Sequence, residues 1–168
     1  NTPQATATPM PNAVIVDKKD AGFTKYGFTS SSYEDTTAGR SYLDHYYFCN
    51  TEPTTEDWWG KWTPNLTYGA GDYEVQINIP SYNATTTAAK YQIYHNGTTD
   101  QVTLRQIDYY NGDWPSLGTF YFAANGSEYL RLGDMTGESD KKIGWDAARF
   151  IFKGTVATAT RTNTPVNT

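Results

Sequence analysis

Cysteine is almost absent from the sequence, which contains it only once in 168 residues, at Cys49. A single thiol cannot form a disulfide within the chain. The sequence also has no C-x-x-C pair and no Cys/His spacing typical of a zinc site. These absences exclude dithiol redox chemistry and a structural zinc ion. Cys49 follows three aromatic residues, and we interpret it as a small buried apolar side chain.

Positive charge and long apolar runs are also scarce. The 13 Lys and Arg residues are outnumbered by 18 Asp and Glu residues, which gives a formal net charge of −5 at pH 7. Nucleic-acid binding needs a clustered surplus of Lys and Arg, so we expect no nucleic-acid partner. No apolar run approaches the ~18–20 residues of a membrane-spanning helix, and we expect no membrane span.

Signatures of catalysis are missing as well. The sequence has no G-x-S-x-G, no H-E-x-x-H, and no Walker or other glycine-rich phosphate loop. Its two histidines, His45 and His95, lie in strand-like segments without the Ser or Asp pattern of a triad. A pair of carboxylates at glycosidase spacing stays open as an alternative. We expect that the chain is not an enzyme.

Aromatic residues, threonine and glycine are what the sequence has in abundance. Tyr, Trp and Thr favour strands, and Gly favours turns. Residues 72–79 alternate polar and apolar side chains without interruption, which predicts a strand with one buried face. Further short strands are predicted at 13–16, 42–49, 90–95, 102–105, 117–122, 128–132 and 148–152. Their number and spacing predict an all-β fold, a two-sheet β-sandwich or jelly roll.

The two ends of the sequence differ from its centre. Residues 1–12 and 154–168 are rich in Thr, Pro and Ala and carry almost no charge. Such segments have too few large apolar groups to pack, and their prolines favour extended backbone. We therefore predict one β-sandwich domain over residues 13–153, with a linker on each side, from a longer multimodular protein.

Three pairs of adjacent aromatic residues are candidates for a ligand surface. The pairs are Tyr46 with Tyr47, Trp58 with Trp59, and Tyr109 with Tyr110. Neighbouring strand residues face opposite ways, so one member of a pair should point out of the core. An exposed aromatic face can stack on a sugar ring or contact another protein. Burial of any one ring in the core is the alternative, and we favour the two pairs that flank residues 50–57.

Two acidic segments are candidates for binding calcium. The loop at 133–140 offers three carboxylates but not in the order of an EF-hand, and we interpret it as a solvated turn. The second group consists of Asp17, Asp20 and Asp146. These residues come together only if the first and last strands of the domain are neighbours.

A series of motifs runs through most of residues 13–152. The segment VIVDKKDAGF at 14–23 is similar to a "VDN-x-DAGF" opening strand and turn. Further motifs are WTPNL at 62–66, GDYEV at 71–75, YQIYHNG at 91–97, WPSLGTFYF at 114–122 and WDAARF at 145–150. In the same order, they resemble the motifs of the golvesin C-terminal domain family, also described as a xanthan-lyase carbohydrate-binding-like domain.

The resemblance implies a jelly-roll β-sandwich of galactose-binding-like type, without a catalytic centre and appended to secreted or surface enzymes. It also implies that Trp62 and Trp114 are framework residues. In galactose-binding-like sandwiches an ion often joins the first and last strands, so a structural calcium ion would use Asp17, Asp20 or Asp146. No other cofactor is expected. Residues 46–59 depart from the family pattern, and a specific function would lie there.

Together these observations predict a non-catalytic, extracellular or cell-surface accessory module of a larger protein. Its predicted partners are a polysaccharide or surface glycan and the neighbouring domains of the same chain. The alternative is a structural or adhesive module that spaces its neighbours or contacts protein. An exposed aromatic strip lined with polar side chains favours the first function, and a flat apolar patch favours the second.

Overall fold

A computed structural model describes residues 10–28, 33–110 and 112–155 of the protein. In chain order its elements are β1 (Ala13–Val16), β2 (Phe23–Tyr26), β3 (Glu34–Asp35), η2 (Tyr42–Asp44), β4 (Tyr46–Asn50), β5 (Trp59–Trp62), β6 (Gly71–Ile77), β7 (Ala89–His95), β8 (Thr98–Leu104), η3 (Gln106–Asp108), β9 (Ser116–Phe122), β10 (Tyr129–Gly133), β11 (Lys142–Trp145) and β12 (Ala148–Gly154). Except for a few residues at their inner ends, the predicted linkers lie outside the described residues and stay a prediction.

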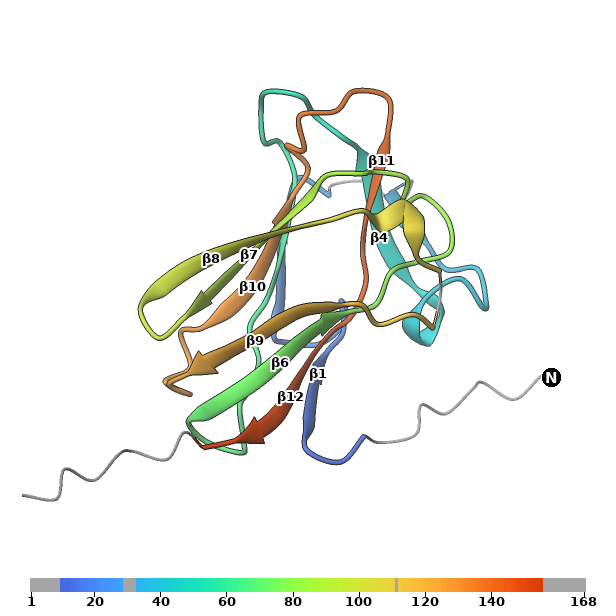
Figure 1. The fold of residues 1–168 in the computed structure, drawn as a ribbon. Helices are drawn as coiled ribbons and strands as arrows, with labels where there is room; N and C mark the ends of the chain where they lie inside the picture. The colour runs from blue at the N-terminus through green and yellow to red at the C-terminus, as the bar shows by residue number, and fades with distance from the viewer. Residues whose placement is uncertain (1–9, 29–32, 111, 156–168) are drawn as a thin grey trace, which may run out of the picture.

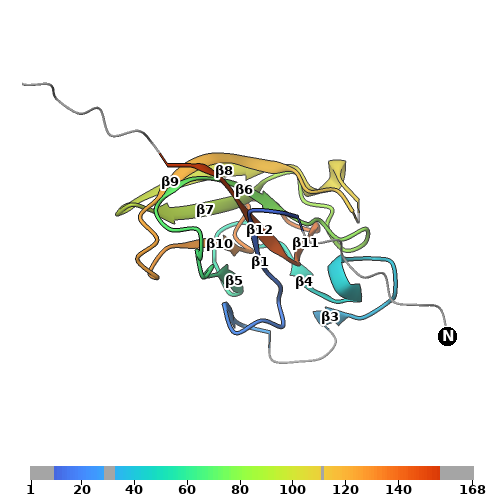
Figure 2. The same cartoon turned by 90° about the horizontal axis from the view of Figure 1, so that it is seen from below.

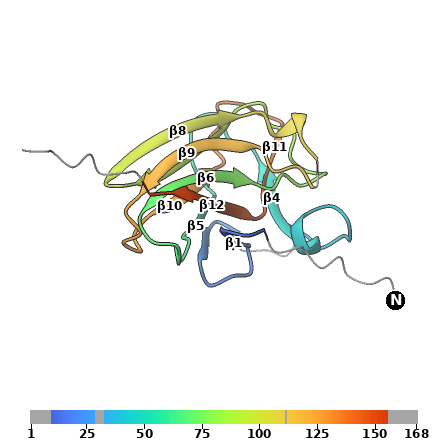
Figure 3. The same ribbon diagram turned by 60° about the horizontal axis from the view of Figure 1, so that its bottom comes forward.

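Two antiparallel sheets face each other as layers (Figure 1). One sheet has the strand order β1-β12-β6-β9, which Figure 3 shows from its outer side, and the other has the order β2-β5-β10-β7-β8. A third sheet, β11-β4-β3, lies toward one end of the sandwich (Figure 2). The predicted all-β fold is confirmed, while its assignment to the galactose-binding-like type stays a prediction. No helix in the described part of the chain has the length and hydropathy of a membrane span.

The core lies between the two large sheets, and alternation of side chains along the strands builds it. On β6 every second residue is buried, including Tyr73, Val75 and Ile77, as the alternating pattern predicts. On β7 Tyr91 and Ile93 are fully buried in the same way, from the opposite layer. These residues belong to one continuous apolar cluster, so the sheets are held together mainly by burial of apolar surface.

Two tryptophans fill the end of this core near the third sheet. Trp62 and Trp145 are fully buried, and each indole N–H donates to a backbone carbonyl at 2.9 Å. A Cβ atom on Gly60 would lie 2.6 Å from the ring of Trp145 and 2.9 Å from that of Phe23. Position 60 on β5 therefore requires glycine, because any side chain would collide with these rings.

The predicted strand at 42–49 begins later than expected. Residues 42–44 form the short element η2 in place of a strand, and Leu43 and Asp44 have positive φ angles of 53° and 62°, which interrupt the extended backbone that a strand needs. Aspartate tolerates this left-handed region better than most residues. The Asp44 side chain also accepts a hydrogen bond from the backbone N–H of Gly39 at 2.7 Å. Strand β4 consequently starts at Tyr46.

Candidate functional site

The outer face of the five-stranded sheet carries one polar side chain from each strand, in a line that we call the polar row. Thr24 of β2 lies opposite Lys61 of β5, and Lys61 lies opposite Arg131 of β10. Arg131 lies opposite Gln92 of β7, which lies opposite Gln101 of β8. Adjacent strands are about 4.8 Å apart, so the row extends about 19 Å across the sheet.

These side chains point outward because their neighbours along each strand are apolar and buried. Arg131 lies between Leu130 and Leu132, which are both fully buried. Lys61 precedes Trp62, which is also fully buried. Since successive strand residues point to opposite faces, Lys61 and Arg131 project away from the core.

A stacked pair of aromatic rings lies on each side of the polar row. Tyr26 and Trp59 stack with ring centroids 6.2 Å apart and an interplanar angle of 15°. Tyr94 and Tyr129 stack at 5.2 Å and 28°. The Tyr26 side chain is 63% exposed, and the other three rings are half-buried. The face therefore combines flat apolar surfaces with hydrogen-bonding groups between them.

An ion pair holds a carboxylate over one side of this face. Glu56 comes from the loop that precedes β5 and forms a two-point ion pair with Arg131, one contact being 3.1 Å. The same guanidinium donates to Gln92 Oε1 at 3.3 Å and lies 5.2 Å from the Trp59 ring. A Cβ atom on Gly133 would overlap the Glu56 carboxyl group, so glycine is needed for this close approach.

A shallow hollow of about 60 Å³ opens beside this ion pair. Its lining includes Lys90, Gln92 and Gln101 from β7 and β8, and Met135 after β10. The hollow is polar and small, and it lies on the same sheet face as the polar row. We treat the polar row, the two aromatic pairs and this hollow as one candidate site, the outer-face site.

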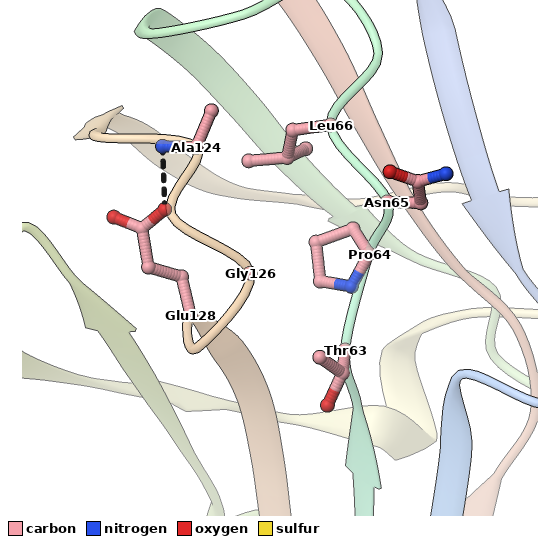
Figure 4. Close-up of a pocket in the computed structure, with 7 residues that line it drawn as sticks. All are labelled: Thr63, Pro64, Asn65, Leu66, Ala124, Gly126 and Glu128. Atoms are coloured by element: carbon pink, nitrogen blue, oxygen red, sulfur yellow. Dashed lines mark hydrogen bonds between the residues drawn. The ribbon is translucent and has the colours of Figure 1, made fainter.

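A larger pocket of about 280 Å³ lies where β5 ends and β10 begins (Figure 4). Residues 63–66 form one wall, and the loop with Ala124 and Glu128 forms the other. The buried Glu128 carboxylate accepts hydrogen bonds from the backbone N–H groups of Asn96, Ala123 and Ala124 at 2.7 to 2.8 Å. This carboxylate therefore orders two loops and is already committed to that structural role.

Another pocket, of about 130 Å³, lies next to Trp58 and Tyr33. Asp134 lines it and is fully buried. One oxygen of Asp134 accepts the Asp57 N–H at 3.1 Å, while Oδ2 has no hydrogen-bond partner in the described structure. Burial raises the pKa of Asp134 to about 6. Burial also raises the pKa of Cys49 in the same pocket, which matches its interpretation as a buried apolar side chain.

The predicted aromatic pair at β4 divides between core and surface. Tyr46 is fully buried, and its hydroxyl bonds with Asp35 at 3.0 Å and with Asn83 at 3.1 Å. Its ring has no exposed face, which corrects the expectation that Tyr46 contacts a ligand. Tyr47 is half-buried, and the ammonium groups of Lys18 and Lys25 each lie 4.0 Å from its ring centroid.

The other predicted aromatic residues do not form a single surface. Trp58 packs edge-on against Phe28 and Tyr33, with centroids 4.9 and 4.2 Å apart. Tyr109 is half-buried against the core, and Tyr110 is 64% exposed in the loop before β9. Only Trp59 belongs to the outer-face site. Tyr26, Tyr94, Tyr129 and Arg131 were not among the predicted site residues. Tyr94 lies in the strand predicted at 90–95, next to the buried Ile93, so its outward position could have been inferred from that strand.

The three aspartates proposed for calcium lie near paired strands, since β1 and β12 are neighbours. Asp17 and Asp146 are buried, and each has one oxygen without a hydrogen-bond partner. Asp20 is exposed, and its Oδ2 accepts the backbone N–H of Asp17 at 2.8 Å, so it closes a turn. Within the described residues, no group of three or more His, Cys, Asp or Glu side chains is arranged to hold a metal ion. Among the described residues, the three aspartates therefore do not form a carboxylate set for calcium, and the expected calcium ion stays a prediction.

The buried aspartates are instead linked to protein groups. Asp17 Oδ2 lies 3.2 Å from His45 Nε2, and Asp146 Oδ2 accepts the Tyr42 N–H at 2.9 Å. Burial raises the pKa of Asp17 to about 6 and the pKa of Asp146 well above its usual value. Burial also lowers the pKa of His45. The cluster thus favours uncharged side chains.

Comparison with known proteins confirms the resemblance noted in the sequence. Residues 14–152 match the family model of the golvesin C-terminal domain. The structure is similar to part of a Paenibacillus xanthan lyase, with a TM-score of 0.70 and 24% sequence identity. The similarity covers 85% of this chain and only 13% of the lyase. No functionally curated protein sequence matches the chain.

Proposed function

Since the chain belongs to the golvesin C-terminal domain family, we propose that it is a non-catalytic, polysaccharide-binding accessory module of a secreted or cell-surface protein. The observation that carries this proposal is the outer-face site. It places hydrogen-bonding groups in a row between two stacked aromatic pairs on an open sheet.

The chemistry of this face suits a sugar chain. A pyranose ring presents C–H groups that can cover an aromatic face, as on Tyr26 and Trp59, and so remove apolar area from water. Its hydroxyl groups both donate and accept hydrogen bonds, which matches the amides of Gln92 and Gln101. A row of about 19 Å across the sheet has room for several linked sugar units.

The structural neighbour is consistent with an accessory role. It is named as a lyase of the polysaccharide xanthan, and the region similar to this chain is a small part of it. A module of this size attached to a catalytic protein would keep that protein close to its polymer. The secreted location and the neighbouring domains remain part of the proposal.

We propose that the domain is not catalytic because its two histidines and the buried Glu128 already interact with other protein groups. His95 lies 2.9 Å from both the Tyr121 carbonyl and the Asp100 carboxylate. His45 is buried beside Asp17, and Glu128 accepts three backbone N–H groups. None of these groups belongs to the outer-face site.

The test is retention of the domain on insoluble polysaccharides and its retardation in gels that contain soluble ones, xanthan included. Trp59→Ala should weaken binding by about fivefold or more, because loss of an aromatic ring that stacks on a nucleic-acid base costs about 1–3 kcal/mol and stacking on a sugar is expected to cost a similar amount. Tyr110→Ala is the matched control, since it removes an exposed ring outside the site. Binding that is equal in Trp59→Ala and the parent, or no binding to any glycan, would overturn the proposal, and the latter would favour the structural alternative.

A further inference from the structure

The outer-face site has a charge opposite to that of the whole molecule. The chain carries a net charge of −5, yet the outward strand positions of this face include Lys61, Lys90 and Arg131 and no acidic residue. The acid that lies over the face is Glu56, which comes from a loop and is paired with Arg131. The face therefore carries a surplus of two positive charges.

Two of these cations have no carboxylate partner among the described residues. In the part of the chain that the structure describes, neither Lys61 nor Lys90 lies within ion-pair distance of a carboxylate. The Lys61 ammonium group lies 5.1 Å from the ring centroid of Tyr129, and Lys90 lines the small hollow. Strand and residue spacings place their Cα atoms about 12 Å apart.

We propose that the ligand of the outer-face site is an anionic polysaccharide, whose acidic groups pair with Lys61 and Lys90 while its sugar rings stack on the aromatic pairs. This inference rests on the proposed function and specifies the class of glycan. Two separated cations beside stacking rings suit a chain that carries acidic groups at intervals, because each ammonium can pair with a different unit.

Glu56 acts against such a ligand in this arrangement. Its carboxylate neutralises Arg131 and lies over the sheet beside Gly133. An acidic sugar approaching Arg131 would meet this negative charge, so removal of the charge should strengthen binding. Substitutions of Glu56 and of the two lysines therefore shift affinity in opposite directions, which a purely structural role for these residues would not produce.

The experiment compares acidic and neutral polymers in affinity gels with the intact chain. The acidic probes are polygalacturonate, alginate and xanthan, and the neutral probes are methyl-esterified pectin, xylan and hydroxyethyl cellulose. We expect retardation by at least one acidic polymer, stronger than by any neutral one and weakened when salt rises from 50 to 500 mM, conditions under which surface charge pairs are screened.

Variants then assign the effect to the site. Lys61→Gln and Lys90→Gln should each weaken binding to the retained acidic polymer by about fivefold, and Glu56→Gln should strengthen it. Lys19→Gln and Lys141→Gln each remove one positive charge, as the site variants do, from an exposed position outside the face, and each should leave binding nearly unchanged. Thermal unfolding of each variant checks that it is folded.

The outcomes separate this inference from the proposed function. Binding to a neutral polymer that needs Trp59 but neither lysine would keep the function and overturn the anionic ligand. Equal losses in the site variants and in the control variants would show that net charge alone attracts the polymer, which also overturns the inference. No binding to any polymer would overturn both.

Discussion

The outer faces of the two large sheets are built from similar strands but use their charges differently. On the four-stranded sheet, Lys153 pairs with Glu74 at 2.6 Å, and Arg149 donates to Gln76 at 2.5 Å and lies over Trp114 at 4.3 Å. These charged groups are already paired or stacked within the protein.

On the five-stranded sheet, the ammonium groups of Lys61 and Lys90 have no carboxylate partner among the described residues. The ring of Tyr26 is also largely exposed. A surface whose groups pair with each other gains little from a ligand, because each new contact replaces an old one. The comparison therefore shows which of two polar surfaces is available for binding.

Within β5 the same comparison can be made between two tryptophans only three residues apart. Trp62→Ala should reduce the free energy of unfolding by about 3–5 kcal/mol, because it empties a fully buried position and removes the indole bond to the Asp146 carbonyl. Trp59→Ala should reduce it by less than about 1 kcal/mol while weakening glycan binding. Chemical denaturation measures both values, and similar losses in the two variants would place Trp59 in the core.

Two buried aspartates should control the pH dependence of stability. The pKa values of Asp17 and Asp134 are raised to about 6 in the folded protein, above the usual 3.8. The folded state therefore binds more protons than the unfolded state between these values, so stability should fall as pH rises from about 4 to about 6.

Asp134→Asn should remove part of this dependence. The amide keeps an acceptor for the Asp57 N–H and carries no charge to bury, so at pH 7.5 the melting temperature should rise by about 3 °C. At pH 4.5 the variant and the parent should differ little. Melting curves of the variant and the parent at the two pH values test this prediction. An equal increase in melting temperature at both pH values would assign the effect to packing and not to charge.

The smallest expected effect comes from the paired face. The bond from Lys153 holds the pKa of Glu74 at about 2, so its contribution to stability is present above pH 4.5 and is lost as pH falls toward 2. Glu74→Gln should cost less than about 1 kcal/mol at pH 7 and leave glycan retention unchanged. Loss of retention in this variant would show that the binding surface extends to the four-stranded sheet.

The sequence predicted the strands that have clean alternation or a continuous apolar run, and it missed the short strands β2, β3, β5 and β11. Residues 72–79 predicted β6 because every second side chain is apolar, and the strand predicted at 90–95 corresponds to β7. Strand β5 was not predicted, since Gly60 interrupts its pattern and is required there only because Trp145 lies against it. That contact joins residues far apart in the chain and leaves no local signal.

The candidate site was predictable only in part for the same reason. Trp59 was selected from its doublet, whereas its stacking partner Tyr26 and the neighbouring Arg131 come from distant segments. Their association depends on the register of β2, β5 and β10, which local patterns do not specify. Tyr46 was misjudged because its doublet does not reveal which ring faces inward.

The pairing of β1 with β12 has a mechanical consequence. These strands are antiparallel, and Ala13 lies opposite Ile151, so the chain enters and leaves the sandwich side by side (Figure 1). Tension applied across these two points would peel the strands apart and load their hydrogen bonds one after another, not all together. A pull transmitted through both ends of the domain would therefore open the β1 edge first, on the sheet opposite the outer-face site.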